Sequence, residues 1–198
     1  MTLLRIGVDE AGYGPLLGPL CVAAFSTTAP PGAGGLDSKR IFRPGRLDRL
    51  ISVCASLDPG TVGGIPGSAE TCDQDEPWMQ HPVPDDVLGL FSPAAQGGAK
   101  NVWVELNCAH AVELNREFTQ RNKAEVLSAR VGGVLMRSLH HFDAQTFDIT
   151  VDRLGGRTRY GPLVESWGFT LQEARERREI SWYRVRWRGR EGEISFRV

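Results

Sequence analysis

Three acidic side chains stand directly after two short apolar runs. Asp9 and Glu10 follow LLRIGV at residues 3–8, and Asp152 follows FDITV at residues 147–151. If these runs are neighbouring strands, the three carboxylates converge at one sheet edge. Carboxylates in contact need a cation, and hard oxygen donors select Mg²⁺ or Mn²⁺. Two such ions about 3.5–4 Å apart can cleave a phosphodiester. The alternative is that Asp9 and Glu10 serve only as turn and helix-cap residues.

Apolar spacing predicts the elements that must position these acids. The first two strands must be antiparallel, because their Gly- and Pro-rich connection is too short for a crossover. The pattern predicts strands at residues 3–8, 20–27, 101–107 and 147–151, helices at about 44–57 and 111–142, and a β-hairpin at about 180–198. Strands mixed with helices indicate an α/β fold with a mixed central sheet flanked by helices.

The longer predicted helix has an apolar stripe at helical spacing. Four basic residues lie mostly off it, on the face where polar residues are usual: Arg121, Lys123, Arg130 and Arg137. The stripe consists of Phe118, Leu127, Val131, Val134, Leu135, Leu139 and Phe142.

Length and composition predict one soluble domain over residues 1–198. The chain has 198 residues, of which 41% are hydrophobic and 24% charged, which excludes a disordered tail, a collagen-like chain and a disulfide miniprotein. The four cysteines form no Cys-x-x-Cys pair, as expected of a reduced, cytoplasmic chain. No apolar run approaches ~18 residues and the N-terminus has no signal-peptide pattern. We expect a monomer with no membrane association.

Charge is distributed unevenly along the chain. Residues 1–152 hold 12 Lys+Arg and 18 Asp+Glu (net −6), whereas residues 153–198 hold 11 Arg and 6 Glu (net +5). The segment at about 58–98 has 6 Pro, 7 Gly and seven acids without Lys or Arg, so we expect a surface insertion that repels nucleic acid. The basic C-terminal part suggests an anionic partner, phosphate being the commonest, although a solvated hairpin face would give the same count.

The aromatic residues of the hairpin allow two interpretations. Interleaved with arginines, they could stack and clamp nucleic acid. An inward apolar row on an alternating strand is the equally weighted alternative. The residues concerned are Trp182, Tyr183 and Trp187 with Arg184, Arg186, Arg188 and Arg190.

The string IGVDEAGYGPLLGPL at residues 6–20 resembles the opening motif of the ribonuclease HII family, the type 2 ribonucleases H. That motif reads Asp-Glu-Ala-Gly-Arg-Gly-Pro, and this chain differs from it at one place in seven. LDSK at residues 36–39 is similar to the family's Asp-Ser-Lys element, and Val151-Asp152 matches its third acidic position. The resemblance covers about residues 3–52 and 111–160.

This resemblance implies a ribonuclease H-like fold and endonucleolytic hydrolysis of RNA. The substrate would be an RNA–DNA hybrid or DNA containing ribonucleotides, cleaved with two Mg²⁺ or Mn²⁺ ions. Asp9, Glu10 and Asp152 match the family's catalytic metal ligands.

The same resemblance implies a set of nucleic-acid contacts. Gly12 and Gly14 would let the backbone approach the substrate, with their amides reading the 2′-hydroxyl. Ser38 and Lys39 would contact a phosphate, and the less favoured alternative for Lys39 is a solvated surface lysine. Tyr13 occupies the position of the family's arginine, so a guanidinium that could bind phosphate is replaced and junction specificity is open.

The family's fourth acid follows a strand that EISFRV at residues 193–198 resembles. We therefore expect the chain to be a fragment or its metal cluster to be incomplete, and its own activity to be weak or absent. Two rival classes remain: a non-catalytic nucleic-acid-binding relative, and a sugar-kinase or actin-like ATPase. Pro15 stands where the ATPase class has Thr or Ser. A catalytic role for His110, His140 or His141 ranks lower, because adjacent histidines face different directions.

Overall fold

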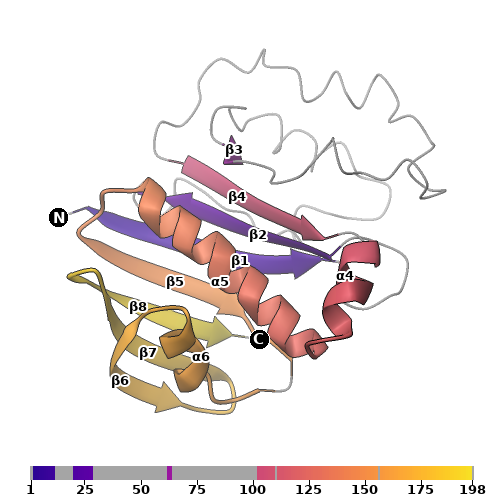
Figure 1. Ribbon diagram of the computed structural model, residues 1–198. Coiled ribbons are helices and arrows are strands. Elements are labelled where there is room, and N and C mark those ends of the chain that lie inside the picture. Colours follow the sequence, from indigo (N-terminus) through magenta and orange to yellow (C-terminus); the bar gives the residue numbers. More distant parts are fainter. Residues whose placement is uncertain are drawn as a thin grey trace, which may run out of the picture.

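One eight-stranded sheet organises the described part of the chain (Figure 1). The computed structural model describes residues 2–11, 20–28, 62–63, 102–109, 111–155 and 157–197. The strand order is β3-β4-β2-β1-β5-β8-β7-β6, and the sheet mixes parallel with antiparallel pairs, which confirms the predicted mixed α/β class. The strands are β1 (Leu3–Ala11), β2 (Leu20–Thr27), β3 (Val62–Gly63), β4 (Val102–Ala109), β5 (Thr146–Asp152), β6 (Thr170–Glu176), β7 (Ile180–Trp187) and β8 (Arg190–Arg197).

Three neighbouring central strands run in the same direction. β1 pairs with β5 in parallel, and β5 pairs with β8 in parallel. β1 pairs with β2 antiparallel, which confirms the prediction for the first two strands. Because β1, β5 and β8 end at the same side of the sheet, their last residues share one edge. We call this end, formed by residues 9–11, 152–153 and 197, the carboxyl edge.

The helices α4 (Ala111–Phe118) and α5 (Lys123–His141) replace the single helix predicted over residues 111–142. That prediction was wrong because Asn122 begins a new helix. Its side chain accepts a hydrogen bond from the amide of Glu125 (3.0 Å), and the Glu125 carboxylate accepts one from the amide of Asn122 (3.1 Å). This reciprocal capping box satisfies two amides that a helix start leaves without partners.

The core lies between α5 and the sheet. Strand side chains alternate, so β1 and β5 turn their buried residues toward α5, which crosses β1, β2 and β4 (Figure 1). Most of the predicted stripe is buried, but Phe118 is 38% exposed, because it ends the separate helix α4. None of the described helices is long and apolar enough to cross a membrane.

The C-terminal part is a three-stranded meander of β6, β7 and β8. The predicted hairpin is confirmed, and its turn residues Arg188 and Gly189 both have positive φ (49° and 80°), as a two-residue type I′ turn requires. α6 (Gly161–Ser166) and β6 were not predicted. The helix is six residues long, and β6 is mostly exposed, so neither has a strong apolar pattern.

Aromatic side chains join the meander to α5. The ring of Tyr160 stacks on Phe196 with centroids 3.8 Å apart. Trp167, at the end of α6, donates from Nε1 to the carbonyl of Ser128 on α5 (3.0 Å). A Cβ at Gly132 would lie 2.4 Å from the Trp167 ring, so this close approach requires glycine.

Candidate active site at the carboxyl edge

Asp9 and Asp152 are brought together by strand register. Val8 of β1 is the partner of Val151 in β5, and both are buried against the helices. The next residues in register, Asp9 and Asp152, therefore lie on adjacent strands and on the opposite, open face, where both are exposed. Asp9 accepts a hydrogen bond at Oδ1 from the amide of Glu10 (2.8 Å).

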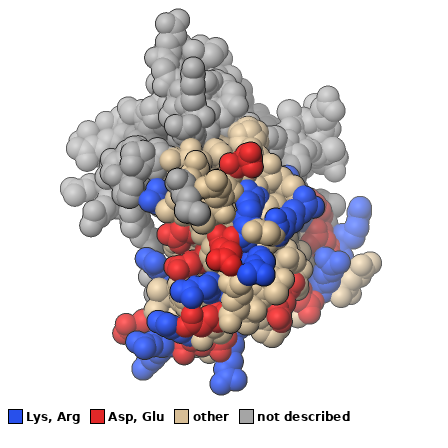
Figure 2. Space-filling model, turned by 90° about the vertical axis from the view of Figure 1, so that its left-hand side faces the viewer, with Lys and Arg blue, Asp and Glu red and all other residues tan. Residues whose placement is uncertain are grey.

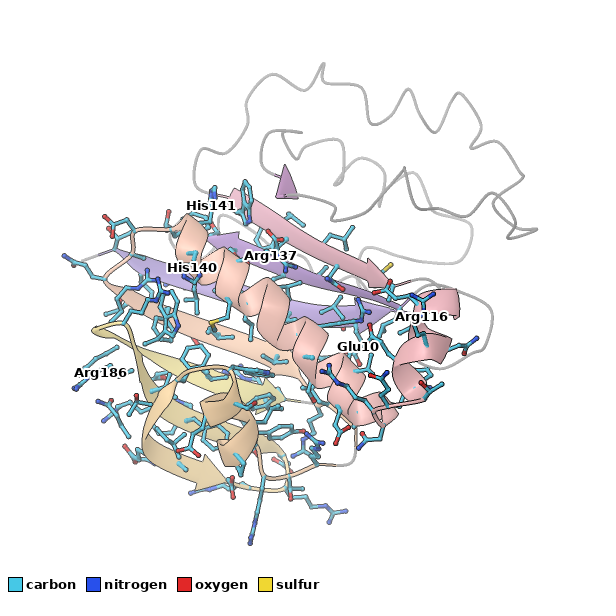
Figure 3. The ribbon with its side chains drawn as sticks, viewed as in Figure 1. Glu10, Arg116, Arg137, His140, His141 and Arg186 are labelled. Carbon is cyan, nitrogen blue, oxygen red and sulfur yellow. The ribbon has the colours of Figure 1, made fainter. Side chains whose placement is uncertain are left out.

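Glu10 lies beside these two acids on the other face of the pleat. Figure 3 shows it at the end of the sheet where β1 ends, away from His140, His141 and Arg186. Burial raises the pKa of the Glu10 carboxyl above its usual value, and the charges of Asp9 and Asp152 raise it further. The three carboxylates thus share one electrostatic environment.

The donor chemistry of this group fits a divalent cation. All three donors are carboxylates, and mutual repulsion of the kind that acts on Glu10 is relieved by a nearby positive ion. Within the described ranges, however, no three Asp, Glu, His or Cys side chains lie close enough together to hold a metal ion. The described carboxylates have the donor chemistry of a divalent-cation site, but they do not form a complete set of ligands.

A polar network fixes the helices beside Glu10. Glu10 pairs with Val22, and Val22 pairs with Asn107, so Glu10 and Asn107 lie in one row about 10 Å apart. Arg130 on α5 donates to Asn107 Oδ1 (2.6 Å). Arg130 also donates to Glu113 (2.8 Å) and to Glu117, both on α4. One guanidinium therefore ties α4, α5 and β4 together near the carboxyl edge.

This network was missed at the sequence level. Arg130 was expected on the solvated face, yet its side chain is only 10% exposed. Arg137 is 42% exposed, as expected, but it also pairs with Glu105, which is buried and accepts a hydrogen bond from Trp103 (3.1 Å). The available signal was the spacing of Glu113 and Glu117, four residues apart on one helical face.

Two of the three aromatic residues of the predicted arginine–aromatic clamp face inward. The third, Trp182, lies beside Arg175 and Arg184, whose guanidinium carbons are 5.1 and 5.5 Å from its ring centroid, so for Trp182 the clamp stays a prediction. Tyr183 is fully buried and Trp187 is 5% exposed, so neither ring can stack on a nucleobase. The inward apolar row was therefore the correct alternative for these two residues. Arg190 does not reach outward either: its guanidinium donates to the carbonyls of Leu139 (2.7 Å), Phe142 (2.8 Å) and Ala144 (3.1 Å), which closes the C-terminal end of α5.

The two described histidines of α5 contribute to packing. His140 contacts the carbonyl of Met136 through Nδ1 (2.6 Å) and meets Trp187 edge-on at 4.9 Å. His141 stacks on Trp103 with centroids 3.6 Å apart. Both lie far from the carboxyl edge in Figure 3.

Several predicted site residues lie outside the described residues. These are Gly12, Tyr13, Gly14, Ser38 and Lys39. The predicted helix at 44–57 and His110 also lie outside, as does the insertion at 58–98 except for β3. Their predicted roles stay predictions.

Comparison with known proteins finds distant similarity to one enzyme family. No family model matches the chain. Ribonuclease HII of Haloarcula marismortui is 33% identical over 96 residues, which are 48% of this chain and 44% of that protein. The matched stretch thus spans less than half the length of this relative. The solved PCNA:RNase HII complex from Archaeoglobus fulgidus aligns with a TM-score of 0.38 at 15% identity, over 83% of this chain and 56% of that chain.

Proposed function

We propose that this chain has a ribonuclease H-like fold and is an endonuclease that hydrolyses the RNA strand of RNA–DNA hybrids, or ribonucleotides embedded in DNA. One observation supports this most directly: the register that places Asp9 and Asp152 on adjacent parallel strands at the carboxyl edge. The similarity to ribonuclease HII over half the chain adds to it.

The mechanism assigns a role to each carboxylate. Asp9, Glu10 and Asp152 would hold Mg²⁺ or Mn²⁺, and such ions supply an activated water and stabilise the charge on the leaving oxygen. Asp9 and Asp152 are exposed on the open face, where a phosphodiester can approach. Glu10 lies on the other face of the strand, and the charges of Asp9 and Asp152 act on its carboxyl.

Selection of RNA would depend on residues of the first motif and of the Asp-Ser-Lys element. The amides of Gly12 and Gly14 would read the 2′-hydroxyl, with Tyr13 between them at the substrate. Ser38 and Lys39 would bind a phosphate. We also propose that the chain acts as a cytoplasmic monomer, which agrees with the free thiol of Cys21.

A second candidate function is a nucleic-acid-binding relative without catalysis. It is favoured by one observation: no three acidic, His or Cys side chains within the described ranges form a metal-binding group. The two functions share a substrate and differ only in metal-dependent cleavage.

Cleavage of an end-labelled RNA–DNA hybrid separates the two functions. The nuclease requires cleavage with Mg²⁺ or Mn²⁺ that EDTA abolishes. Asp9→Asn should lower the rate by at least about 100-fold, because removing even an outer-sphere partner of a metal costs 10–100-fold. Glu193→Gln, an exposed acid on β8, is the control and should cleave like the unaltered protein. Binding without cleavage would select the second candidate, and EDTA-resistant cleavage would contradict both.

A further inference from the structure

Six of the arginines after residue 153 form two groups of three that differ in their contacts. One group is held by protein partners on the outer face of the meander. Arg186 pairs with Glu191 at 3.0 Å, and Glu173 pairs with both Arg175 (2.7 Å) and Arg184 (3.5 Å). These three arginines share two carboxylates, so they offer less charge to a ligand than unpaired arginines do.

The second group consists of Arg177, Arg178 and Arg197, which we call the arginine edge. All three side chains are exposed. Among the described residues, none of their guanidinium groups has an ion-pair or hydrogen-bond partner. They are therefore the arginines that a partner can reach without breaking an existing contact.

Strand pairing places the arginine edge next to the candidate active site. Arg197 is the partner of Asp152 across β5 and β8. Ile180, at the start of β7, is the partner of Arg197, and Arg177 closes the β6–β7 turn by donating its amide to the carbonyl of Ile180 (3.0 Å). The order along the carboxyl edge is thus Asp9, Asp152, Arg197 and then the turn.

Arg153, the residue after Asp152, fastens this arrangement. Its amide donates to the carbonyl of Arg197 (3.0 Å), and its guanidinium donates to the carbonyls of Arg177 (3.4 Å) and Arg178. The arginine-bearing turn is therefore tied to the strand end that holds the third acid. Arg153 is a positioning residue here, because its own charge is directed at backbone.

We propose that the arginine edge binds the sugar–phosphate backbone of a nucleic-acid strand that runs along the carboxyl edge, past Asp9 and Asp152. The path from Asp152 over β8 to β7 covers two strand spacings, about 10 Å. One strand of a duplex has one phosphate per ~3.4 Å of axis, and neighbouring phosphates lie farther apart than this rise because the backbone winds around the axis, so this path can span two phosphates. The inference rests on the proposed function and names the contact that would orient its substrate.

Acidic residues of the same turn do not cancel this surface. Glu176 accepts a hydrogen bond from the Tyr183 hydroxyl (2.5 Å) and lies 3.6 Å from Arg159, which is itself highly exposed. Glu179 of the turn and Asp152 opposite Arg197 are the remaining acids, against the three arginines of the arginine edge. The net charge there stays positive.

The test measures binding of a fluorescent RNA–DNA hybrid in EDTA by fluorescence anisotropy, over a range of salt concentrations. The variant Arg177→Gln/Arg178→Gln/Arg197→Gln should bind more weakly. Its slope of log K against log salt should be shallower by about 0.9 for each phosphate that the protein no longer neutralises. The charge-matched control is Arg175→Gln/Arg184→Gln/Arg186→Gln, which should keep the slope of the unaltered protein. Circular dichroism and thermal unfolding verify that both variants fold.

The outcomes separate this inference from the proposed function. Equal slopes for the two triple variants would overturn the proposal that the arginine edge binds nucleic acid. The cleavage assay would still test the nuclease independently. A shallower slope in the first variant alone, with no metal-dependent cleavage by the unaltered protein, would support the arginine edge and contradict the nuclease. Absence of hybrid binding by the unaltered protein would overturn the inference.

Discussion

Two rows of cross-strand neighbours on the open face of the sheet differ in how their acidic residues are balanced by basic ones. In the middle of the sheet, Asp148 and Glu193 are partners, and the row continues to Arg5 on one side and Arg184 on the other. Each acid there has a cationic neighbour. Figure 2 shows the end of the sheet where β1 and β5 begin, with acidic and basic residues interspersed over its surface.

The row at the carboxyl edge lacks this balance on one side. Asp9 is the partner of Ala23 on β2, so β2 supplies no cation, and Arg197 flanks only Asp152. Like charges opposite one another destabilise a sheet. Proteins retain such arrangements where function requires them, at some loss of stability. The difference between the rows supports the proposal that the carboxyl edge binds a charged ligand.

Both rows depend on the pairing of β5 with β8. The variant with the largest expected effect on stability disturbs this pairing. In Gly192→Ala the new Cβ would lie 2.2 Å from the Phe147 ring and 2.5 Å from its carbonyl oxygen. Backbone must move, so we expect a loss of about 3 kcal/mol in the free energy of unfolding. Urea denaturation measures it. Gly7→Ala on β1, whose Cβ would meet nothing within 4 Å, should change stability little.

The next prediction distinguishes an arginine that stabilises the fold from an arginine in an exposed ion pair. Arg190→Gln should lower the free energy of unfolding by about 2 kcal/mol, because three carbonyls at the end of α5 lose a charged donor. Arg186→Gln, which breaks an exposed ion pair, should cost less than about 0.5 kcal/mol. Thermal unfolding of the two variants gives the ranking. Equal losses would contradict the structural role of Arg190.

The smallest expected effect has the opposite sign. Without added metal, Asp9→Asn should raise the free energy of unfolding by about 0.5 kcal/mol, because it removes repulsion from Asp152 and Glu10. Asp148→Asn, in the balanced row beside Arg5, should lower it by a few tenths of a kcal/mol. Differential scanning calorimetry in EDTA compares the pair. Destabilisation by Asp9→Asn would contradict the claim that the acids of the carboxyl edge repel one another more than those of the middle row.

The sequence patterns predicted the acids and the strands that bring two of them together. LLRIGV and FDITV are apolar enough to define β1 and β5, and each ends in an acid. Their adjacency was a condition of the hypothesis, because no local pattern reveals which strands pair. The break at Asn122 was missed because the apolar spacing continues across it, although the capping-box residues were present.

Arginine roles were the least predictable part of the site. The count of eleven arginines after residue 152 indicated an anionic partner. Register alone does not separate Arg186 from Arg197, because each lies opposite an acid. Only the ion pair of Arg186 with Glu191 distinguishes them. Arg190 donates to carbonyls some fifty residues away in sequence, a long-range contact that no spacing rule contains.

The most direct measurement is Mn²⁺ binding followed by electron paramagnetic resonance at neutral pH, without substrate. The account predicts that the unaltered chain binds Mn²⁺ and that Asp9→Asn/Asp152→Asn weakens binding by at least about tenfold, since two carboxylate donors are removed. The matched control Asp148→Asn/Glu193→Gln removes two acids from the balanced row of the same face and should bind like the unaltered protein. Equal Mn²⁺ affinity in all three proteins would contradict the assignment of the carboxyl edge as the metal-binding active site.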